Sequence, residues 1–176
     1  MTGFIILFRG VGGATQLPVA RLREVLTQAG FAKVATYINS GNAVLSSGHD
    51  ASTTRARIAA IVKGEFGFEK DIMIMSHSDW ARLIERNPFP EAVDEPTTLH
   101  AFVLAGIPEE RDVAALEART TGRERMVVDG TILYFHAPDG FGTSKLPPVI
   151  DRTLRVTSTA RNWRTVQALM KLSREM

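Results

Sequence analysis

The sequence predicts an α+β fold made of two halves, and three observations lead to this prediction. In the first half, apolar residues change between a strand period and a helical period in the order β-α-β-β-α-β. The same order begins again after a proline-punctuated connector, and 176 residues are enough for two such units. This order is that of the ferredoxin-like unit. We therefore expect two ferredoxin-like (βαββαβ-type) halves, duplicated and packed together, with largely antiparallel sheets.

Glycine and proline separate the elements of the first half. Pro18 lies near the start of the first predicted helix, and Gly30 and Gly67 follow two helical stripes as stop residues. The predicted elements are, in order, a strand at Phe4–Phe8, a helix from Pro18 to Gly30, strands at Lys33–Ile38 and Ala43–Ser46, a helix marked by Ile58 to Phe66, and a strand at Asp71–Ser76.

The second half begins after a short helix and a connector that carries Pro88, Pro90 and Pro96. The predicted elements are a helix at Ser78–Arg86, a strand at Leu99–Leu104, a helix at Glu109–Ala118, a hairpin of Arg125–Val128 and Thr131–His136, and a last helix from Ser158 to Leu172. The closing strand is absent from this pattern or displaced toward Thr153–Val156. We expect a first half at 1–87, a connector at 88–97 and a second half at 98–176, either separate or intertwined as one domain.

Composition narrows the function classes. The formal net charge is only +2 and no basic run occurs, so nucleic-acid binding has little support from charge. The absence of cysteine excludes disulfides and thiolate chemistry, and the four histidines are too far apart in sequence for a metal site. No apolar run is long enough to cross a membrane. The expectation is a cytoplasmic protein without metal, cofactor or membrane partner.

Four motifs occur in order along the chain: FRGVGG, TYINSGN, PDGFGTSKL and TARNWRTV. Together they resemble the family catalogued as domain of unknown function 1697. The resemblance implies an α+β fold of paired ferredoxin-like halves, found in bacterial cytosolic proteins with no agreed activity. The first motif departs from the family pattern, because Val11 follows Gly10 directly and Ala14 stands where the family carries Lys.

Three of the motifs allow both a structural and a binding interpretation. The glycines after Arg9 lie between a strand and a helix, where bare N–H groups can cradle a phosphate with Arg9 as counter-charge or simply make a tight connection. Ser40 and Asn42 suit a hairpin turn and can also contact a ligand. The neighbouring Ser144 and Lys145 indicate a solvated loop, a ligand contact, or a nucleophile with its base.

The motif TARNWRT predicts the start of the last helix, with Thr159 as N-cap. At 100° per residue, Trp163 faces the core, and Arg161 and Thr165 form one exposed donor cluster. Asn162 lies at the border between the two faces. Since the first turn of a helix has unpaired N–H groups and a partial positive charge, this segment is a candidate anion site.

Three functions follow from these motifs. The favoured one is a small anionic or phosphate-bearing ligand held in a pocket formed by the Gly-rich loops and the start of the C-terminal helix. The alternatives are a nucleic-acid-binding protein, or an enzyme in which Tyr37, Ser40 or Lys145 performs proton or acyl chemistry. The candidate ligand-binding residues are Arg9, Tyr37, Ser40, Asn42, Ser144, Lys145, Arg161, Asn162 and Thr165.

Overall fold

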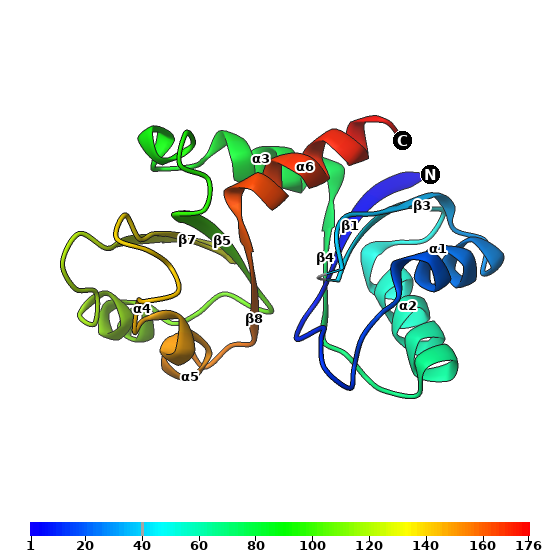
Figure 1. Cartoon of the computed structure of the whole chain (residues 1–176), viewed down its shortest axis with the longest axis horizontal. Coiled ribbons are helices and arrows are strands. Elements are labelled where there is room, and N and C mark those ends of the chain that lie inside the picture. Colours follow the sequence, from blue (N-terminus) through cyan, green and yellow to red (C-terminus); the bar gives the residue numbers. More distant parts are fainter. Residues whose placement is uncertain (40) are drawn as a thin grey trace. The chain divides into compact units, whose positions relative to one another are not determined.

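The computed structural model describes residues 1–39 and 41–176 (Figure 1). The predicted turn residue Ser40 lies outside the described residues. The chain divides into two compact units, one of Met1–Ile84 together with Gln167–Met176, and one of Glu85–Val166. Each unit is described by itself below.

The first unit has the predicted β-α-β-β-α-β order followed by a third helix. Its elements are β1 (Thr2–Phe8), α1 (Val19–Gln28), β2 (Ala32–Thr36), β3 (Asn42–Ser47), α2 (Ala51–Phe66), β4 (Ile72–Ser76) and α3 (His77–Glu85). The strands form one sheet in the order β2-β3-β1-β4, and every neighbouring pair is antiparallel. This is the strand order expected of a ferredoxin-like unit.

Helices α1 and α2 cover one face of the first sheet. Leu22 and Leu26 of α1 and Ile58 of α2 are buried in one cluster with Phe4 and Ile6 of β1. The alternate residues of β1 thus meet the apolar stripes of both helices, as the sequence periods predict. Gly67 ends α2 in the left-handed conformation, with φ of 76°.

The second unit repeats this arrangement. Its elements are η1 (Pro90–Ala92), β5 (Leu99–Leu104), α4 (Glu110–Glu117), β6 (Arg125–Asp129), β7 (Ile132–His136), η2 (Pro147–Val149), α5 (Ile150–Leu154) and β8 (Ser158–Asn162), followed by α6 (Trp163–Arg174). The antiparallel sheet has the order β6-β7-β5-β8, which matches β2-β3-β1-β4 position by position. The two halves and the α+β class are therefore confirmed. Among the described residues, no helix is long and apolar enough to cross a membrane.

The end of the second unit differs from the prediction. Ser158–Asn162 is not the first turn of the last helix but the closing strand β8, which pairs antiparallel with β5 and places Ala160 opposite Phe102. The short helix α5, at Ile150–Leu154, precedes it and is not among the predicted elements. The segment STARN has no apolar period of its own, so its strand conformation depends on pairing with a strand distant in sequence. The closing strand is thus present, and it lies after Thr153–Val156.

Both sheets pass directly from their last strand into a helix. β4 ends at Ser76 and α3 begins at His77, while β8 ends at Asn162 and α6 begins at Trp163. The hydroxyl of Ser76 accepts a hydrogen bond from the Asp79 N–H at 3.1 Å and donates one to the Asp79 carboxylate at 2.6 Å. The last residue of this strand is therefore also the N-cap of the helix that follows.

Candidate functional site

Two of the four motifs meet in the first unit. The Gly-rich loop (residues 9–16) follows β1, and the hairpin tip (described residues 37–39, 41 and 42) lies where the chain passes from β2 to β3. The N–H of Phe8 donates to the carbonyl of Gly41 at 2.8 Å. Gly41 has φ of 76°, and a Cβ there would lie 2.6 Å from Cγ2 of Val11 and 2.9 Å from Cβ of Phe8. Only glycine allows this approach, so the loop and the tip are packed together.

Lys70, in the segment that precedes β4, contacts the Gly-rich loop. Its ammonium donates hydrogen bonds to the carbonyl of Gly10 and to Oγ1 of Thr15. Oγ1 of Thr15 donates in turn to the carbonyl of Gly12 at 3.1 Å. Residue 14 of the loop is Ala and not Lys. The side chain of Lys70 nevertheless places an ammonium against the same loop.

The sheet register explains the position of Lys70. β1 and β4 are antiparallel with Phe8 opposite Ile72, so the residues after β1 meet the residues before β4. The N–H of Arg9 donates to the carbonyl of Asp71 at 2.9 Å, and the side chains of Arg9 and Asp71 approach to 4.0 Å. Lys70 was not predicted as a site residue because it lies outside every motif, although the predicted β-α-β-β-α-β order already brings these two chain segments together.

A pocket of about 480 Å³ lies where this loop and tip meet the start of α1. It is lined by Gly12 and Gln16 of the loop, Asn39 of the tip, and Pro18, Val19 and Ala20 at the helix start. Among the residues that the structure describes, no side chain caps α1, and the first turn of α1 has no acidic residue. The first-turn N–H groups of α1 and the positive end of its dipole are therefore available at this pocket.

At the hairpin tip, Asn42 has a structural role. It is 1% exposed, and its Nδ2 donates to the carbonyl of Tyr37 at 3.2 Å. The N–H of Tyr37 donates to the carbonyl of Asn42, also at 3.2 Å. Between them, Ile38 is 54% exposed and has φ of 46°, which is uncommon for a β-branched residue. Contacts of Tyr37 and Asn42 with a ligand stay a prediction.

In the second unit, Phe141 anchors the loop of Pro138–Leu146 to the sheet. Its ring stacks on that of His100 with centroids 3.6 Å apart, and contacts the rings of Phe102 and Phe135 at 6.2 and 6.1 Å. The hydroxyl of Ser144 accepts from the Leu146 N–H at 3.1 Å, while Lys145 is exposed. Within the described residues, Ser144 and Lys145 share no hydrogen bond, so the loop does not show the pairing that a nucleophile and its base need.

His100 was not singled out from the sequence. It is buried, and its Nδ1 has no hydrogen-bond partner among the described residues. Burial lowers the pKa of His100 to about 4, so the imidazole is neutral at pH 7.

The three predicted residues around Trp163 do not share a helix face, because Arg161 lies on β8. Nη1 of Arg161 donates to Oγ1 of Thr159 and to the carbonyl of Ala160, both at 2.7 Å, and burial lowers the pKa of Arg161 to about 10. Oδ1 of Asn162 accepts from the Thr165 N–H at 3.0 Å, so Asn162 and not Thr159 is the N-cap. Thr165 is only 6% exposed. The predicted exposed cluster of Arg161 and Thr165 is therefore wrong.

Arg161 and the anchor of the Pro138–Leu146 loop lie on opposite faces of the second sheet. Arg161 is paired with Ala101, whose neighbours His100 and Phe102 both contact Phe141. Since successive strand residues point to opposite faces, Ala101 and Arg161 face away from Phe141. The structure thus does not bring Arg161 to the base of this loop.

The nine predicted residues are divided between the units. Arg9, Tyr37 and Asn42 belong to the first unit, with Ser40 outside the described residues, and Ser144, Lys145, Arg161, Asn162 and Thr165 belong to the second. The first group belongs to the Gly-rich loop and the hairpin tip, but the pocket at the start of α1 is lined by other described residues of these segments, Gly12, Gln16 and Asn39. The second group forms a loop and a strand–helix junction.

Comparison with known proteins places the chain in a family. Among solved structures, the conserved bacterial protein SP0830 from Streptococcus pneumoniae is similar over 98% of both chains, with a TM-score of 0.75 and 20% sequence identity. At this identity the likeness concerns the fold alone. No curated protein matches the chain. The sequence model described as protein of unknown function (DUF1697) matches residues 1–134. The chain therefore belongs to the DUF1697 family of proteins of unknown function.

Proposed function

We propose that the protein binds a small anionic or phosphate-bearing ligand in the pocket at the start of α1. The observation that carries this proposal is the first turn of α1, which no described side chain caps and which lines a pocket of about 480 Å³ together with the Gly-rich loop and the hairpin tip. A pocket of this size is large enough for a phosphate group with a small organic part. Contacts from Ser144, Lys145, Arg161, Asn162 and Thr165 stay a prediction.

The groups around the pocket favour a negative charge. The first-turn N–H groups of a helix can donate to an anion, and the helix dipole adds a partial positive charge. Gly12 leaves the loop backbone accessible, because a Cβ built there would meet nothing within 4 Å. Gln16 and Asn39 add amide donors, and the ammonium of Lys70 lies on the same loop. None of the described residues that line the pocket carries a carboxylate.

The same lining favours a binding site over a catalytic one. Gly, Gln, Leu, Pro, Val, Ala and Asn line the pocket, and none of these side chains exchanges a proton near pH 7. A general acid or base would have to come from the ligand or from solvent. We therefore favour ligand binding over an enzyme function.

Substitution of Ala20 tests the site. Ala20 is exposed in the first turn of α1, where a carboxylate interacts favourably with the helix dipole and competes with an anionic ligand. Inorganic phosphate and pyrophosphate are titrated into the wild type, Ala20→Glu and the isosteric Ala20→Gln, and the thermal unfolding midpoint is recorded. At 100 times its dissociation constant, a bound anion adds about 2.7 kcal/mol of stability. We expect this gain in the wild type and Ala20→Gln and not in Ala20→Glu.

A second pair of variants tests the charge at the loop. Lys70→Ala removes the ammonium that contacts the loop, and Arg55→Ala removes an exposed charge on α2 outside the pocket lining. Anion affinity is expected to fall several-fold in Lys70→Ala and to stay unchanged in Arg55→Ala.

Equal anion affinity in Ala20→Glu and Ala20→Gln would show that the start of α1 is not the site.

A further inference from the structure

Strand β6 (Arg125–Asp129) forms one edge of the second sheet. The strand order is β6-β7-β5-β8, so β7 is the neighbour of β6 on one side and no described strand lies on the other. All 5 residues of β6 pair with β7 without a register shift. An unpaired edge of regular strand is a template for a further strand. The outer side of β6 is therefore a surface on which another strand can be added.

The corresponding edge strand of the first unit is less suited to such pairing. β2 (Ala32–Thr36) has the same position in its sheet as β6. The register of β2 shifts between Ala32 and Ala35, and Lys33 lies at this irregularity with φ of 52°. An irregular register and an edge lysine both hinder the addition of a strand. β6 has neither of these features.

The hairpin geometry determines which backbone groups of β6 point outward. A two-residue turn joins β6 to β7, so Asp129 at the end of β6 is in a hydrogen-bonded pair with β7. Hydrogen-bonded and non-hydrogen-bonded pairs alternate along antiparallel strands. The N–H and C=O groups of Met126 and Val128 therefore point to the open edge. In the described part of the chain, these groups have no hydrogen-bond partner.

We propose that β6 pairs with β6 of a second copy of this chain, antiparallel and about a two-fold axis at Val127. In this register Met126 of one copy lies opposite Val128 of the other, so the outward N–H and C=O groups of both residues are paired in both strands. Registers centred on Met126 or Val128 would place some of these groups opposite the preceding loop or the turn. Val127 is 37% exposed in the single chain, and in the pair it contacts Val127 of the second copy.

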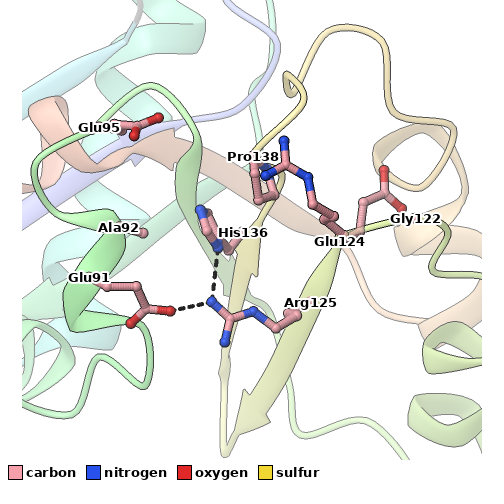
Figure 2. Close-up of a pocket in the computed structure, with 9 residues that line it drawn as sticks. Glu91, Ala92, Glu95, Gly122, Glu124, Arg125, His136 and Pro138 are labelled. Atoms are coloured by element: carbon pink, nitrogen blue, oxygen red, sulfur yellow. Dashed lines mark hydrogen bonds and ion pairs between the residues drawn. The ribbon is translucent and has the colours of Figure 1, made fainter.

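The charges of β6 complement one another in the same register. Arg125 and Asp129 lie at the two ends of the strand on one face, so Arg125 of one copy lies opposite Asp129 of the other. Figure 2 shows the contact of Arg125 with Glu91 in a pocket beside β6. At the other end, Nε of Arg86 lies 3.0 Å from the carboxylate of Asp129. The charged groups along the pair then alternate in sign, whereas a parallel pair would bring like charges together. The charges therefore favour an antiparallel second copy as the partner.

A single cysteine tests this register directly, because the chain has no other cysteine. In Val127→Cys the two thiols belong to a non-hydrogen-bonded pair, where the Cα atoms are about 4.5 Å apart and a disulfide can form. Under mild oxidation we expect a covalent dimer to form about tenfold faster in Val127→Cys than in Ile107→Cys, whose cysteine replaces an exposed apolar residue outside β6. Denaturing urea should remove this difference. Equal rates in the two folded variants overturn the proposal.

Sedimentation equilibrium measures the association without a covalent bond. The wild type, Val127→Lys and Ile107→Lys are compared at protein concentrations up to about 1 mM. Since Val127 is exposed, the folded chain has room for the lysine, but the pair would then hold two ammonium groups opposite each other. We expect the dimer dissociation constant to rise about tenfold in Val127→Lys and to stay unchanged in Ile107→Lys. A monomeric wild type, or equal association of both variants, overturns the proposal.

Discussion

His100 is a buried imidazole with aromatic neighbours. It stacks on Phe141 in the core of the second unit, and its Nδ1 has no partner among the described residues. A buried donor or acceptor without a partner lowers stability, and a charge at the same place lowers it further. The cost of this residue therefore depends on pH.

Replacement of His100 by Phe is expected to reduce acid destabilisation. The pKa of His100 is lowered from 6.5 to about 4 in the folded protein, so between these values the unfolded chain binds more protons. Stability is then lost as pH falls from about 6.5 toward 4. His100→Phe should avoid on the order of 2–3 kcal/mol of the loss between pH 7 and pH 4.5, measured by urea unfolding. An equal loss in the variant and the wild type would contradict this account.

Gly41 tests the close packing of the Gly-rich loop against the hairpin tip. Gly41→Ala places a Cβ 2.6 Å from Val11 at a residue with φ of 76°. We expect a loss of about 2–4 kcal/mol, from backbone strain and overpacking together. Gly48→Ala is the matched control, since a Cβ there meets nothing within 4 Å and its φ is not positive. Urea unfolding of both variants measures the difference, and equal stabilities would contradict it.

Among the elements, those bounded by glycine or proline were predicted within a few residues. The prediction was wrong for β8, because STARN is polar and its strand conformation comes from pairing with β5. Thr159 also satisfied the residue preference of an N-cap, so the local signal favoured a helix that began too early. Non-local pairing decided between two conformations that the local sequence allows.

The cap of α6 gives a prediction for this junction. Asn162→Ala removes the acceptor of the Thr165 N–H and is expected to lower the free energy of unfolding by about 1 kcal/mol. Asn162→Asp keeps an acceptor and adds a charge that suits the helix start, so its stability should stay near that of the wild type. The urea midpoint of the three proteins tests this. If Asn162→Asp lost as much stability as Asn162→Ala, the hydrogen bond from the Thr165 N–H would not be the source of the stabilisation.

For the whole molecule, the repeated order of elements could be predicted, whereas the sites could be predicted only in part. Arg9 and the glycines after it predicted a loop between a strand and a helix, because the local composition determines such a connection. In the structure, Gly12 of this loop lines the pocket. Lys70 was missed because its contact with Gly10 follows from the sheet register.

The two junctions without a linker also limit how the family can diverge in length. One residue inserted between Ser76 and His77, or between Asn162 and Trp163, would turn the following helix by about 100° and remove its cap. Such insertions would move buried residues such as Trp80 and Trp163 away from their packing positions. Length changes are therefore expected in surface loops. Relatives should align across both junctions without gaps, even where few residues are identical.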